Sequence, residues 1–154
     1  MTPRAFALAV SLLIVALFLP GTSRAQVPFE ANRIEWSSYD SPATEAMEVL
    51  RSRADLEALW IRTGRRGTPP DVEFRRQTAV AYLLGVRPTG GYRVELESVR
   101  VERGTLTLHF VEIAPGPCCV AGQVSTFPGL FITTIPWKGP VAFERRVEFR
   151  NCCP

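Results

Sequence analysis

The sequence lacks the residue patterns on which most enzyme classes depend. It has one histidine, His109, and contains no Gly-x-Ser-x-Gly elbow, no His-Glu-x-x-His helix and no phosphate-binding loop. Strand alternation groups His109 with Thr105 and Thr107, on the side that we expect to face solvent. The acidic pair Glu95 and Glu97 has arginine neighbours, which favour ionised carboxylates over the protonated form that a general acid must hold. We therefore expect no enzymatic activity.

Long apolar runs are also missing, except near the amino terminus. An uncharged stretch over residues 5–19 follows Arg4, and small residues stand before Gln26. This layout is typical of a secretory signal peptide, and the run is shorter than the roughly 18 residues of a membrane-spanning helix. We predict a signal peptide over residues 1–25 and a single exported domain over residues 26–154. The domain should be periplasmic or secreted, without stable membrane insertion after cleavage.

Neither charge sign is in large excess. The formal net charge of +3 falls to +1 once Arg4 and Arg24 leave with the signal peptide. The basic residues are almost all arginine, and they alternate with glutamates instead of forming a stripe that could follow phosphates. We expect a solvated surface of mixed charge and no nucleic-acid partner.

Only four cysteines occur, in two adjacent pairs: Cys118 with Cys119, and Cys152 with Cys153. Export would place them where thiols oxidise. Joining neighbours within a pair requires a strained ring, so we predict two bridges between the pairs, with the connectivity left open. Closing a loop of roughly 34 residues stabilises a fold by about 3 to 4 kcal/mol. A tetrathiolate zinc site is the alternative, but paired zinc ligands usually stand two to four residues apart. We predict structural disulfides, no metal and no cofactor.

A helix is predicted over residues 53–63. Ser52 and Asp55 before it have the spacing of a capping box, and Gly64 is a stop signal. Its apolar residues fall on one face, which we expect to cover a sheet: Leu56, Leu59 and Trp60, with Ile61 beside them.

Most of the remaining chain favours strands. Residues 79–84 are apolar enough for a central strand buried on both faces. The alternating segments around Val94 and Leu108 flank a tight turn at Arg103 and Gly104, which predicts a hairpin. We expect an α+β domain, mainly an antiparallel, sandwich-like sheet with one helix packed on it. Further strand candidates are residues 46–50, 130–135 and 141–149, whereas the polar leader with Ile34, Trp36 and Tyr39 receives no element.

The candidate recognition site is the loop that joins the central strand to the hairpin. Proline suits the first corner of a turn there, and the two glycines can adopt positive φ. Such a loop can also be a mere connection. The loop consists of Arg87, Pro88, Thr89, Gly90, Gly91 and Tyr92.

The sequence around this loop resembles the C-terminal domain of the PrcB family. The resemblance covers about residues 78–143 and rests on the string from Leu84 to Glu95, on Leu106 to Leu108, on Pro115 with Gly116, and on Gln123 to Pro128. The family takes its name from a subunit of an exported bacterial protease complex. The resemblance implies a non-catalytic accessory domain that assists or stabilises a protein partner, with an exported protease as the candidate.

Two other functions remain open. The loop is similar to the Pro-Thr-Thr-Gly-aromatic loop of chagasin-like cysteine protease inhibitors, although Gly91 is inserted before the aromatic residue. An envelope structural module that binds peptides by strand addition at a sheet edge would need no loop chemistry.

Overall fold

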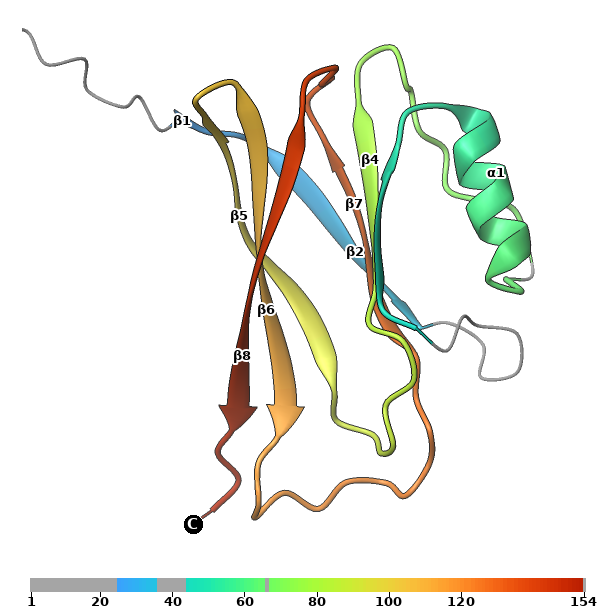
Figure 1. Ribbon diagram of the computed structural model, residues 1–154. Helices are drawn as coiled ribbons and strands as arrows, with labels where there is room; N and C mark the ends of the chain where they lie inside the picture. Colours follow the sequence, from blue (N-terminus) through green and yellow to red (C-terminus); the bar gives the residue numbers. More distant parts are fainter. Residues whose placement is uncertain (1–24, 36–43, 66, 154) are drawn as a thin grey trace, which may run out of the picture.

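The computed structural model describes residues 25–35, 44–65 and 67–153. Two four-stranded sheets face each other: sheet A has the order β1-β5-β6-β8, and sheet B has the order β2-β7-β4-β3 (Figure 1). The fold is a β-rich α+β fold, as predicted. The elements are β1 (Ala25–Gln26), β2 (Phe29–Glu35), β3 (Ala46–Leu50), α1 (Arg53–Arg62), β4 (Thr78–Leu83), β5 (Arg93–Glu102), β6 (Thr105–Pro115), β7 (Pro128–Thr134) and β8 (Val141–Arg150).

The central strand β4 is buried along its whole length, as predicted. Val80 and Tyr82 point into the core between the sheets, where the ring of Tyr82 meets the edge of Phe110 from β6 at a centroid distance of 4.9 Å. Ala79 and Ala81 point to the opposite face of sheet B. Burial on both faces explains why this strand has no polar alternation.

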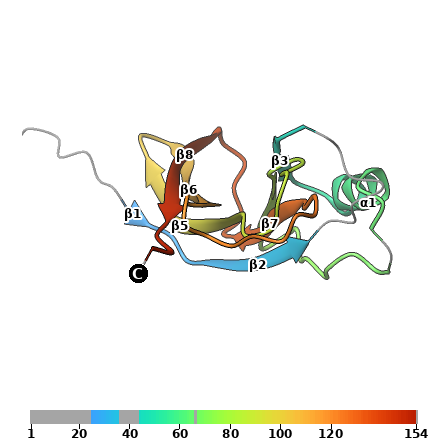
Figure 2. The ribbon, with the colours of Figure 1, turned by 90° about the horizontal axis from the view of Figure 1, so that it is seen from below.

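Helix α1 covers the outer face of sheet B, on the side away from sheet A (Figure 2). The Ser52 hydroxyl accepts a hydrogen bond from the Asp55 N–H at 3.1 Å, and Gly64, at φ 62°, ends the helix with its N–H bonded to the Ile61 carbonyl. Leu56 is fully buried. The predicted caps and the predicted apolar face are confirmed, but Ile61 is 81 % exposed and does not belong to that face.

The β5–β6 hairpin forms around the predicted turn. Arg103 and Gly104 both have positive φ, 50° and 78°, as a tight two-residue reversal requires. One irregularity departs from the predicted alternation: the register shifts between Leu96 and Ser98, so Glu97 lies in a β-bulge. Glu95 and Glu97 therefore do not form a regular pair along one face.

Strand β8 lies at the edge of sheet A and runs parallel to β6, with ten residues in continuous register. The pairing is parallel because the chain leaves sheet A after β6, contributes β7 to sheet B and then returns. From Glu144 to Arg150 the strand is exposed. The prediction of a strand here is confirmed, but the strand is far less buried than its apolar residues suggested.

The amino-terminal described segment connects the two sheets. Ala25 pairs with Val101 of β5 in sheet A, and Val27 bonds to Val99, after which β2 pairs with β7 in sheet B. Sequence analysis assigned no element to this region, so β2 is a correction: its partner strand, not its own composition, defines it. The predicted signal peptide lies outside the described residues except for Ala25, and so do Trp36 and Tyr39. No described helix has the length and apolarity needed to cross a membrane.

Candidate partner-binding site

The predicted recognition loop is fastened along its length to a second loop, residues 116–127. Arg87 and Thr126 exchange two backbone hydrogen bonds of 2.9 and 3.0 Å. The Gly90 N–H donates to the Gly122 carbonyl at 2.9 Å, and the Thr126 hydroxyl donates to the Thr89 carbonyl at 2.9 Å. We call residues 85–92 and 116–127 together the paired loops. Their mutual bonds give both backbones a fixed course.

The turn in the first loop falls at its two glycines. Gly91 has a φ of 88°, and a Cβ there would lie 3.6 Å from the Cβ of Pro115. The positive φ explains why this position suits glycine. Gly90 does not have positive φ, and the chain bends at Pro88 without a regular turn. One of the two glycines thus has the conformation that the sequence allowed for both.

The side chains of Arg87 and Tyr92 do not project from the loop as free recognition groups. The Arg87 guanidinium donates twice to Oε1 of Glu112, at 3.1 and 2.9 Å, and lies over the Tyr92 ring at 5.8 Å. The Arg87 side chain is 20 % exposed and that of Glu112 only 7 %. Arg87 therefore joins the loop to the middle of β6.

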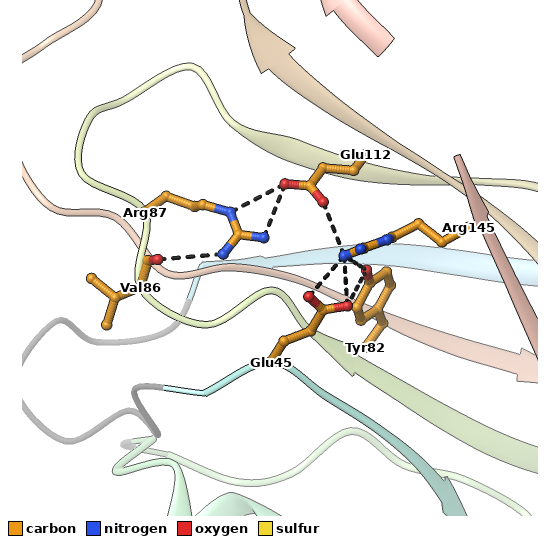
Figure 3. Close-up of polar contacts among 6 residues, drawn as sticks. All are labelled: Glu45, Tyr82, Val86, Arg87, Glu112 and Arg145. Atoms are coloured by element: carbon orange, nitrogen blue, oxygen red, sulfur yellow. Dashed lines mark hydrogen bonds and ion pairs between the residues drawn. The ribbon is translucent and has the colours of Figure 1, made fainter. Parts of the chain in front are cut away.

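Glu112 is shared by two arginines, which extends this contact into a network across the domain (Figure 3). Its second oxygen accepts from Arg145 of β8 at 3.3 Å, and Arg145 also contacts both carboxylate oxygens of Glu45 at 2.7 Å. The Tyr82 hydroxyl donates to Glu45 at 2.9 Å and accepts from Arg145 at 3.4 Å. We call these four residues, together with Arg87, the polar clamp.

The polar clamp favours fixed charge states. Burial raises the pKa of Tyr82 well above its ordinary value, so the phenol stays neutral and can donate to Glu45. The hydrogen bond with Tyr82, followed by nearby carboxylate charges, raises the pKa of Arg145. Two arginines face two glutamates, so each charge has an opposite partner. The arrangement suits a clamp that holds the loop, β4, β6 and β8 together.

Residues 78–134 match the family model described as PrcB C-terminal. This match confirms the predicted resemblance of this segment to the PrcB C-terminal family. The match starts at Thr78, as predicted, and ends at Thr134 instead of Phe143. No curated protein and no solved structure matches the chain. The family match does not support the similarity to chagasin-like inhibitors, which stays a prediction.

The PrcB C-terminal segment contains both paired loops and two of the four cysteines; the other two follow β8. The bridges join Cys118 to Cys153 and Cys119 to Cys152, so each connects the second loop to the end of the described chain. The two disulfides therefore hold the second loop against the end of β8. No group of residues suited to hold a metal ion occurs in the part of the chain that the structure describes.

The backbone also approaches closely beside the bridges. A Cβ on Gly116 would lie 2.4 Å from the carbonyl oxygen of Arg150, which is too close for any side chain. Gly116 thus allows the start of the second loop to lie against the end of β8. The sequence shows this glycine, but its partner lies more than thirty residues away.

Large apolar side chains are exposed near the paired loops. Val120 and Val124 of the second loop are 104 % and 62 % exposed, and Val86 of the first loop is 38 % exposed. We call Val86, Val120 and Val124 the loop-end surface; the two loops that carry them lie in the lower part of Figure 1. The site predicted from the sequence included none of these three valines, although apolar residues in a turn-rich loop could have signalled them.

His109 differs from the sequence expectation. Its side chain is only 18 % exposed, its Nδ1 lies 3.1 Å from Oε2 of Glu144, and its buried Nε2 has no hydrogen-bond partner among the described residues. The prediction of a solvent-facing histidine is wrong because β8 lies beside β6 and brings Glu144 over it. Glu95 and Glu97 pair with Arg93 and Arg146 at 2.9 and 3.0 Å.

Proposed function

We propose that this chain is a non-catalytic accessory domain that binds and stabilises a protein partner, an exported protease being the partner class. The PrcB C-terminal match supports the accessory role, since that family is named after a subunit of a protease complex. Two disulfides support an exported place of action, because they persist where the milieu is oxidising, as in the periplasm or outside the cell.

The observation that carries the proposal is the loop-end surface. Val120 and Val124 are exposed on a backbone that hydrogen bonds and two disulfides hold in place. An apolar group on a pre-ordered loop binds a partner without the entropy cost of ordering that loop. Exposed apolar surface marks interaction sites, and all three valines lie on two loops that hydrogen-bond to each other.

The predicted loop then has a supporting role. Arg87 and Tyr92 fix the course of the first loop, and Gly91 provides its turn, so these residues present Val86 and the neighbouring second loop. Pro88 is exposed, whereas Thr89 and Gly90 are half-buried at the seam between the loops. Of the six predicted residues, Pro88 and Gly91 are exposed, and because Gly91 has no side chain, Pro88 is the one whose side chain can contact a partner directly.

The test compares two sets of apolar-to-acidic substitutions. The double variant V120D/V124D changes the loop-end surface, and I61D changes an equally exposed apolar residue on α1. Each tagged variant is expressed in the organism that makes this protein, in place of the native copy. The protease activity that copurifies with it from the envelope and the medium is then measured. We expect V120D/V124D to lose most of this activity and I61D to retain it.

Three results would refute the proposal. One is equal copurification of protease by both variants. Another is the complete absence of copurifying protease with the unaltered chain. The third is slowed papain-like proteolysis by the purified chain, which would favour the chagasin-like inhibitor. Thermal unfolding of every variant shows whether a loss reflects the surface or a damaged fold.

A further inference from the structure

The free edge of β8 is the longest regular edge that sheet A offers. Its ten residues pair with β6 in unbroken register, and nothing in the described part of the chain pairs with its other side. Exposed strand edges are usually blunted by bulges, prolines or very short strands. At the opposite side of the sheet, β1 and the bulge at Glu97 serve this purpose for β5. Within β8 there is neither a bulge nor a proline.

The two faces of β8 carry different side chains. Residues paired with the core-facing side of β6 are Val141, Phe143, Arg145, Val147 and Phe149. The outward face carries alternating charges at its end: Glu144, Arg146, Glu148 and Arg150. Val147 and Phe149 are 47 % and 71 % exposed, because sheet B does not cover this end of the strand. The strand therefore presents an open backbone edge, exposed apolar groups and a charge pattern.

The charge pattern is complementary to itself when the strand is reversed. In an antiparallel pair of β8 strands centred on Val147, a residue that precedes Val147 by a given number of positions lies opposite the residue that follows Val147 of the second copy by the same number. Glu144 then faces Arg150 of the second copy, and Arg146 faces the second copy's Glu148. Because a two-fold axis repeats each contact, four opposite-charge pairs form on the outward face.

Neighbouring registers are poorer. Centring on Arg146 places that arginine against its own copy and Glu144 against Glu148, and centring on Glu148 produces like-charge contacts again. Shifting the centre to Arg145 or to Phe149 leaves one opposite-charge contact, which the two-fold axis repeats, so two ion pairs form instead of four. The register at Val147 is thus favoured over each of these four alternatives.

The same register covers the apolar side chains that the monomer exposes. Val147 meets Val147 of the second copy, and Phe149 lies opposite Arg145, against which an aromatic ring can pack. Arg150 has no ion pair in the described residues, so the pairing would supply its first one. We propose that two copies of this chain associate through antiparallel pairing of their β8 strands, centred on Val147, so that the two A sheets form one continuous sheet.

This proposal can be tested separately from the proposed function, because the V120D/V124D substitutions change the loop-end surface and no residue of β8. It predicts concentration-dependent dimerisation of the purified, oxidised protein in sedimentation velocity. Salt should weaken the dimer, since the outward ion pairs are exposed.

Two charge reversals test the register. E148R places arginine opposite Arg146 twice, and R146E places glutamate opposite Glu148 twice. Each variant alone should dimerise about tenfold more weakly or worse, the equivalent of about 1.4 kcal/mol. In a one-to-one mixture, all four positions become complementary, so the two variants should form a mixed dimer that neither forms alone.

Matched controls are D71R and R75E, which reverse exposed charges outside sheet A. Both should dimerise like the unaltered chain. Circular dichroism of each variant checks that the fold persists.

The proposal is overturned if the unaltered chain stays monomeric up to about millimolar concentration, the range in which even weak association becomes visible. It is also overturned if E148R and R146E each dimerise normally, or if their mixture gives no mixed dimer. If the chain is monomeric but E148R loses a captured protease that V120D/V124D keeps, the edge binds a strand of that protease and not a second copy.

Discussion

Strands β4 and β8 both contain enough apolar residues to look like interior strands, yet they occupy opposite environments. All six residues of β4 are buried, whereas β8 is exposed from Glu144 onward. Packing on two faces holds β4. By contrast, β8 is held by its ladder to β6, by Arg145 in the polar clamp and by two disulfides. An apolar strand can thus be held by packing in the core, as β4 is, or by specific polar and covalent links at a sheet edge, as β8 is, where its free side stays available for contacts.

Removing the two disulfides should destabilise β8 more than any other strand. Replacing all four cysteines by serine frees the end of β8 and the second loop, and should lower the free energy of unfolding by about 3 to 4 kcal/mol. Urea unfolding of the oxidised protein and of the variant measures the difference. The reduced, unaltered protein is the control and should lose a similar amount. A loss below about 1 kcal/mol would show that the ladder and the polar clamp suffice to hold the strand.

The polar clamp can be broken at Glu112. In E112A two arginines face each other across a buried site without their shared carboxylate, so we expect a loss of about 3 kcal/mol. E57A removes the exposed i,i+4 partner of Arg53 and should cost less than about 0.5 kcal/mol. Equal losses from the two variants would contradict the role assigned to Glu112. Chemical denaturation provides both values.

A matched pair of valines compares the two strands directly. V80A opens a cavity in the core between the sheets and should cost about 2 to 3 kcal/mol, whereas V147A changes a half-exposed residue and should cost less than about 0.5 kcal/mol. Unfolding is measured at a concentration where the protein is monomeric. Similar losses would mean that β8 is packed as tightly as β4.

The smallest effect concerns the helix that covers β4. Hydrogen bonding, first from the Arg51 N–H and then from Ser52, lowers the pKa of Asp55, so this group stabilises the fold above its unfolded pKa of about 3.9. That contribution is lost as the pH falls through the lower pKa of the folded state. D55N should therefore flatten the acid limb of a stability-against-pH curve, while S52A should cost about 1 kcal/mol at neutral pH. An unchanged acid limb in D55N would exclude this contribution.

Local signals predicted the fold wherever neighbours in sequence are neighbours in space. The turn at Arg103 and Gly104 and the caps at Ser52 and Gly64 depend on nearby residues, and all are found. The burial of β4 followed from its unbroken apolar run. Strand β2 was missed because its mixed composition has meaning only beside β7.

The site was predicted less completely, for the same reason. The loop from Arg87 to Tyr92 was located, but its attachment to Thr126 and Glu112 depends on residues 25 or more positions away. His109 was placed in solvent because no local pattern reveals that β8 returns beside β6. Long-range parallel pairing is the part of this fold that a single sequence conceals.

The position of β8 at the end of the described chain affects how a newly made chain completes sheet A. Synthesis runs from the amino terminus, so β6 has only β5 as a neighbour until the last described strand emerges. No hairpin directs β8 to the β6 of its own chain, so the vacant edge also offers a pairing site to the same strand of another nascent molecule. Oxidation of Cys118 with Cys153 and Cys119 with Cys152 then makes the choice permanent. Self-closed chains become monomeric units, whereas exchanged chains become covalently joined pairs that a non-reducing gel separates from them.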